Sequence, residues 1–209
     1  MPNRSGNAYG LTCLCPLRND SEDDQSYAAI VRGLLRKLPA DENSPLAKVP
    51  NTYLCRMFVL DDVFYEGLPA QEDHLKSKYL VLVVELHGEL DAWLRDMWTH
   101  AHASIALLFK YCIGFRDVDS ADEWVRYIKR CQVETTFYFM GSTDKPLAEQ
   151  LKALYLKQEL ALFVRENQGR DAASLQRAFR EFIARVQPSE LSAPTWRPGA
   201  ASLDTVVKS

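Results

Sequence analysis

The sequence predicts an α+β fold in which helices cover a four-stranded antiparallel β-sheet. Residues 79–86 are a nearly unbroken run of Val and Leu, which is typical of a central, well-covered strand. Gly88 ends this run, and from Leu90 to Cys112 the apolar residues recur at alternating steps of four and three. This spacing indicates a long amphipathic helix. A strand that leads directly into such a helix is therefore the expected centre of an α+β core.

The other elements follow from the same two periodicities, with Pro and Gly as boundaries. The expected strands are residues 11–17, 53–60, 79–86 and 133–140. The expected helices are residues 25–38, 90–112, 120–131, 147–166 and 171–186. Asp24 is the expected cap of the first helix, and Ser120 with Glu123 has the spacing of a capping box. The first elements alternate as βαββαβ, which is the order of the ferredoxin-like fold, and additional helices follow at the C-terminus.

We expect a single domain over residues 10–187, preceded by a flexible arm at 1–9 and followed by a Pro/Ser/Ala-rich tail at 188–209. One layer of helices leaves the second face of the sheet open, although this face carries Tyr79, Val81 and other apolar side chains. An apolar face needs a cover. The C-terminal helices or a second copy of the chain are the expected covers.

Composition limits the classes of partner. The net charge of −3 argues against a general nucleic-acid-binding protein. Charge is uneven, because residues 51–150 carry 10 basic and 16 acidic side chains, whereas residues 151–209 carry 9 basic and 6 acidic ones. No apolar run reaches membrane-span length, and the N-terminus lacks the apolar segment of a secretory signal. Four of the five cysteines lie in apolar patterns, which suits reduced thiols in a cytoplasmic protein.

One candidate binding site is a polar patch on the sheet. Alternation places Glu85 and His87 on one face of the central strand, and Arg56 and Tyr138 can join them from neighbouring strands. A carboxylate beside an imidazole raises the pKa of the imidazole, and an arginine binds anionic groups. The simpler interpretation is a structural Arg56–Glu85 salt bridge at a domain or dimer contact, because most paired charges are not sites.

A second candidate is His102 on the long helix. His100 and His102 project in different directions, so they cannot hold one metal ion together. His102 lies closer to the apolar stripe and is the better axial haem ligand of the two, although a surface or half-buried histidine needs no ligand. The sequence contains no phosphate-binding loop, HExxH motif or dinucleotide fingerprint, and we predict no catalytic residue or metal site.

The segments SPLAKVPNTYLCRMFVLDDV, KYLVLVVELHGELDAWL and VETTFYFMGSTDKPLAEQLKALYLKQEL carry a family resemblance. Over residues 9–165 the chain resembles a bacterial family of ferredoxin-like domains of poorly defined function, found alone or joined to haem peroxidase-like and other oxidative enzymes. His87 stands where members of that family commonly have Asp. The resemblance implies the fold and an oxidative context, without a mechanism.

The sequence therefore favours a non-catalytic accessory or binding protein without a cofactor. It would engage a protein partner, such as a peroxidase or oxygenase, or a second copy of itself, through the sheet face or the helices. One alternative is a haem-dependent, peroxidase-like oxidoreductase with His102 or His87 as axial ligand and Arg56 on the distal side. Another is a binder of a small, lipid-like apolar molecule lodged among the aromatic side chains.

Overall fold

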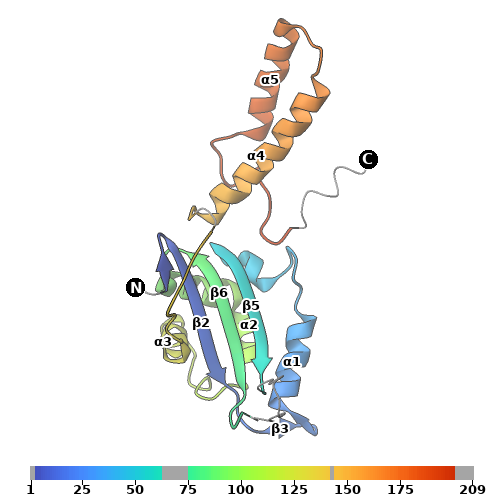
Figure 1. The fold of residues 1–209 in the computed structure, drawn as a ribbon. Coiled ribbons are helices and arrows are strands. Elements are labelled where there is room, and N and C mark those ends of the chain that lie inside the picture. The colour runs from blue at the N-terminus through green and yellow to red at the C-terminus, as the bar shows by residue number, and fades with distance from the viewer. Residues whose placement is uncertain (1–2, 63–74, 142–143, 201–209) are drawn as a thin grey trace, which may run out of the picture.

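The structure is a computed structural model that describes residues 3–62, 75–141 and 144–200. Its centre is a four-stranded antiparallel sheet in the order β1 (Arg4–Ser5), β2 (Ala8–Pro16), β6 (Tyr79–His87) and β5 (Thr52–Leu60). The helices α1 (Tyr27–Lys37), α2 (Leu90–Phe109) and α3 (Ala121–Cys131) pack against one face of this sheet (Figure 1). The α+β class and the four-stranded antiparallel sheet are confirmed.

The central strand and the long helix form as the two periodicities predict. All nine residues of β6 lie within the pairing with β2, and β5 pairs along its other edge. Leu80, Leu82 and Val84 point to the helices and are fully buried. From α2, the fully buried side chains include Leu94 and Met97. β6 is paired on both edges, and the burial of these apolar side chains between its face and the helices is the main stabilisation of the core.

The predicted fourth strand is wrong. Residues 133–140 form no strand, and the fourth strand is β1, which lies within the arm expected to be flexible. The free edge of β2 is already occupied: Gly10 N–H donates to the Asn3 carbonyl at one end, and Ile113 N–H donates to the Pro16 carbonyl at the other. At this edge Gln132, just before the predicted strand, forms an isolated backbone bridge with Cys13, and the chain then leaves the edge of β2. The observed order of strands and helices therefore differs from βαββαβ.

One of the two predicted helix caps is wrong and the other is confirmed. α1 is capped by Ser26, not Asp24, because Asp24 has a positive φ of 62° in the turn that joins β3 (Ser21–Glu22) to β4 (Gln25–Ser26). The capping box of α3 is present, with the Ser120 hydroxyl accepting from Glu123 N–H and donating to the Glu123 carboxylate. A short 3₁₀ helix, η1 (Pro45–Lys48), precedes β5.

The last two helices, α4 (Leu147–Glu166) and α5 (Ala172–Val186), form an antiparallel hairpin that extends away from the sheet (Figure 1). The Phe163 ring lies 4.9 Å from the Phe182 ring, and Arg185 forms an ion pair with Glu159. The expectation that the C-terminal helices cover the second sheet face is therefore wrong. In the described part of the chain, every helix is too short or too polar to cross a bilayer.

Candidate interaction surfaces

The structure brings together only part of the predicted polar patch. Glu85 and Tyr138 are neighbours, because the segment that follows α3 crosses β2 and places the Tyr138 ring over Gly10 (Figure 1). A Cβ on Gly10 would lie 2.9 Å from that ring. Glu85 Oε2 and the Tyr138 hydroxyl are both shielded from solvent, although the two oxygens do not form a well-aligned hydrogen bond. Burial and the adjacent Glu85 carboxylate raise the pKa of Tyr138.

The other two residues of the patch lie apart from this pair. Arg56 is exposed and stands opposite Val83, and within the described residues it forms no ion pair with Glu85. His87 packs edge-on against Tyr53, with ring centroids 6.3 Å apart. The contact of Tyr138 with Gly10 and Glu85 attaches the segment leading into α4 to the sheet.

Three hydrogen bonds complete this attachment. The Tyr53 hydroxyl donates to the Lys145 carbonyl over 2.6 Å, and Leu147 N–H donates to Asn51 Oδ1 over 3.3 Å. Asn7 N–H donates to Asp144 Oδ2 over 2.9 Å. The base of the hairpin is thus held at the end of the sheet where β2 begins and β6 ends.

His102, the candidate haem ligand, lies on α2. Its side chain is exposed, and its ring stands edge-on against Trp98 at 4.2 Å. It lines neither the cavity beside β5 nor the small cavity beside Trp196, both described below. Its observed role is a surface aromatic contact, and haem binding stays a prediction from the sequence.

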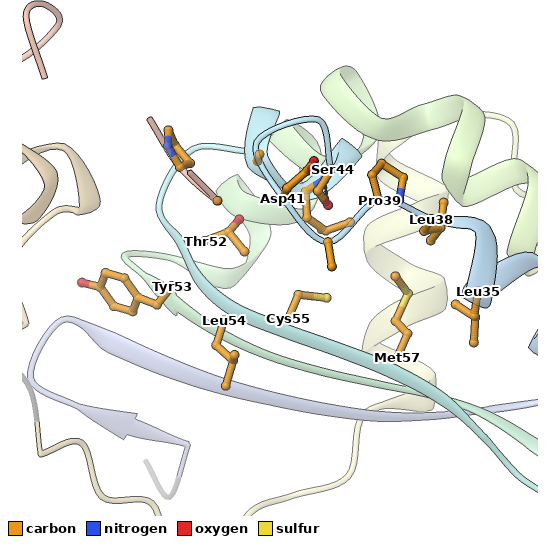
Figure 2. A pocket seen from close by; sticks show the side chains of 15 residues that line it. Leu35, Leu38, Pro39, Asp41, Ser44, Thr52, Tyr53, Leu54, Cys55 and Met57 are labelled. Atoms are coloured by element: carbon orange, nitrogen blue, oxygen red, sulfur yellow. Dashed lines mark hydrogen bonds between the residues drawn. The ribbon is translucent and has the colours of Figure 1, made fainter. Parts of the chain in front are cut away.

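A cavity of about 360 Å³ lies between β5 and the segment that follows α1. Figure 2 shows Cys55 and Met57 of β5 pointing toward the loop that carries Asp41 and Ser44. Leu35 adds a further apolar wall. Burial raises the pKa of the Cys55 thiol to about 12, so this thiol is protonated and unreactive. The size and apolar lining suit a small molecule, but most of the space borders the protein surface.

The largest run of exposed apolar side chains lies on the hairpin. We call this surface the hairpin face; its residues are the half-buried Leu156 and the exposed Leu160 and Val164 of α4, and the exposed Leu175, Phe179 and Ile183 of α5. The three residues of each helix are spaced by four, so they form one stripe along each helix. Leu160 is 46% exposed, Val164 50% and Phe179 45%.

The two stripes point to the same side. Glu159 and Phe163 mark the line along which α4 contacts α5, and Arg185 and Phe182 mark it on α5. At about 100° per residue, each stripe begins about 40–50° clockwise of its contact line, viewed from the N-terminus of its own helix. Because the helices are antiparallel, the clockwise sides of both helices face the same way. The six side chains therefore form one continuous apolar face.

The opposite side of the hairpin is covered at its base by the C-terminal segment. Lys152 is buried, and its Nζ donates to the carbonyls of Val186 and Pro194 over 2.8 Å each. Trp196 is half-buried and lines a small cavity together with Tyr155. The chain thus covers one side of its hairpin and leaves the hairpin face exposed.

No protein-family description, no curated protein and no solved structure matches this chain.

Proposed function

We propose that this chain is a non-catalytic protein-binding module and that the α4–α5 hairpin is its docking element. The observation that carries the proposal is the hairpin face. Its side chains are large, and at 38–50% exposure for the five most exposed they present roughly 400 Å² of apolar surface to water. The largest apolar patch on a monomeric protein is typically about 300–600 Å² and is often functional.

Burial of this surface has a useful magnitude. At about 25 cal/mol per Å², covering 400 Å² contributes roughly 10 kcal/mol, before any contribution from the partner's own surface. Association costs about 4–15 kcal/mol in lost translational and rotational freedom, so the hairpin face is large enough to support binding. An apolar strip on a rigid helix pair is also a common way to bind helices.

The sheet-bearing part of the chain fits a supporting role. We infer that it is a ferredoxin-like core in which the last strand has been lost. The sequence β2, α1, β5, β6, α2 keeps the predicted strand–helix–strand–strand–helix order, and the single bridge from Gln132 to Cys13 lies beside β2, where a fourth strand would pair. In this reading the core positions the hairpin and makes no direct contact with the partner.

Isolation of the tagged chain from its native host tests the proposal. We expect a companion to copurify with the wild type and to be lost from Leu160→Glu. Leu154→Glu is the matched control: Leu154 is the same residue type on the same helix and is 48% exposed, but it points away from α5 and outside the hairpin face. A wild type that is recovered as a lone monomer would refute the proposal.

A variant on the sheet separates the two candidate surfaces. Phe58 lies on the open sheet face and is 45% exposed, which matches Phe179. We expect Phe58→Glu to retain the companion. If Phe58→Glu releases it and Leu160→Glu does not, the docking element is the sheet and the assignment to the hairpin is wrong.

A further inference from the structure

We infer that the hairpin face binds the same face of a second copy of this chain, so that two hairpins form a four-helix bundle. This inference rests on the proposed function and names its partner. A hairpin with one apolar side is half of such a bundle, and a two-fold axis lets one surface serve as both partners.

The heights of the apolar side chains along the hairpin fit this arrangement. The Glu159–Arg185 ion pair and the Phe163–Phe182 contact place residues of α4 and α5 at matching levels. One residue further along α4, Leu160 lies at the level of Ile183. By the same spacing, Val164 lies at about the level of Phe179.

A two-fold axis parallel to the helices turns these levels into contacts. It places α4 of one copy opposite α5 of the other at equal height, with the two helices antiparallel. Leu160 then meets Ile183 of the second copy, and Val164 meets Phe179 of the second copy. Each copy makes both contacts twice by symmetry, so the apolar residues form layers in the way that bundle cores require.

The charged residues at the edge of the hairpin face do not oppose this pairing. Lys157 and Arg180 border the face on α4 and α5. By the same levels, Lys157 lies at about the height of Gln187 of the second copy, and Arg180 lies at about the height of Val164 of the second copy. Neither cation meets a like charge, so the edge carries no electrostatic penalty against a second copy.

The size of the surface predicts the strength of the dimer. Two hairpin faces together bury roughly 800 Å² of apolar surface, and the edge residues add to this area. Specific interfaces bury about 1,200–2,000 Å² in total, so the apolar part of this interface alone lies below that range. We therefore expect a dimer that dissociates on dilution in the micromolar range.

Sedimentation equilibrium of the purified full chain tests this inference, over concentrations from about 1 μM to about 100 μM. The wild type and Leu154→Glu should form a dimer with equal affinity. Leu160→Glu and Phe179→Glu should each weaken dimerisation at least about tenfold, because each places a charge in the bundle core. Leu160 is exposed in the monomer, so circular dichroism of Leu160→Glu should show unchanged helix content, which separates lost association from lost folding. The Phe179 ring also contacts the Phe163 and Phe182 rings of its own hairpin, so Leu160→Glu is the deciding variant.

Two results would overturn the second copy as partner. One is a wild type that stays monomeric at the highest concentration. The other is a dimer that Leu160→Glu leaves intact. If the purified chain is monomeric while the native material carries a different companion that Leu160→Glu removes, the inference fails and the proposed function stands. If native isolation also yields a lone monomer, both fail.

Discussion

Replacement of Lys152 by Met should loosen the C-terminal segment from the hairpin. Lys152 is 2% exposed, and its ammonium donates to two backbone carbonyls, Val186 and Pro194. Val186 is the last residue of α5, where carbonyls lack partners within the helix and a cation is favourable. Met keeps the length and apolar volume of the stem and removes only the ammonium. The variant therefore removes the two hydrogen bonds together with the contact between the ammonium and the Tyr155 ring, whose centroid is 5.5 Å away.

The expected magnitude follows from these contacts. Hydrogen bonds to charged groups contribute about 1.5–3 kcal/mol each, so the two bonds together contribute about 3–6 kcal/mol. The Met variant no longer has the cost of burying an ammonium, and this gain offsets several kcal/mol of the lost hydrogen-bond energy. We expect a net loss of about 2 kcal/mol in the free energy that holds the segment in place, which corresponds to roughly 30-fold more of the open form.

Chymotrypsin measures this opening, because the half-buried Trp196 lies on the segment that Lys152 holds. Cleavage after Trp196 should accelerate roughly 30-fold in Lys152→Met when opening is fast relative to cleavage. Lys157→Met is the control, since Lys157 is exposed on the same helix, and it should change cleavage less than about twofold. Cleavage of Lys152→Met at the wild-type rate would mean that the ammonium does not hold the segment.

Three further outcomes are expected. Gly10→Ala should destabilise the fold by about 1–3 kcal/mol in urea denaturation, because its Cβ would lie 2.9 Å from the Tyr138 ring, and most of this loss should disappear in a Tyr138→Ala background. Hydrogen bonds from Ser174 and the first turn of α5 lower the pKa of Asp171. The stabilisation of α5 by this carboxylate is therefore present above the unfolded pKa of about 3.9 and is lost as the pH falls through the lower folded pKa. Helicity measured by circular dichroism should fall in that pH range in the wild type and not in Asp171→Asn. A hydrogen bond from the Cys15 thiol lowers the pKa of Cys131 to about 7, so mass spectrometry should find Cys131 alkylated first by iodoacetamide, and Cys15→Ala should slow this reaction.

Local pattern was sufficient where an element depends on its own residues. The strand at 79–86 was predicted within one residue, because strand alternation is visible in the segment itself. The helix that begins at Leu90 was predicted at its start for the same reason, but it ends at Phe109, three residues before the predicted Cys112. The helices at 147–166 and 171–186 were predicted for the same reason. A two-residue strand such as β1 is too short to carry any pattern.

The fourth strand failed because pairing is decided elsewhere in the chain. Residues 133–140 have β-branched and aromatic side chains, yet a strand also needs an open edge, and β2 has its edge occupied by residues distant in sequence. Without that edge, Phe137 is 82% exposed and Phe139 73% exposed. The Glu85–Tyr138 contact survives because it needs only that the segment crosses the sheet, and Gly10 provides the space for the ring.

The sequence of α4 contains more apolar residues than one packing surface requires, and this excess is the sequence signal for the hairpin face. In α4, apolar residues occur on all sides of the helix, whereas a helix that packs on one neighbour needs one stripe. The surplus indicates two or more packing surfaces, and α5 with the C-terminal segment accounts for only part of them. The open sheet face also exposes Leu54 and Phe58, but there the exposed Arg56 stands between them on β5. A partner on the sheet must accommodate that charge, and a partner on the hairpin face meets none within either stripe. Because no charged side chain interrupts the two stripes, the hairpin face is favoured over the sheet face as the docking surface.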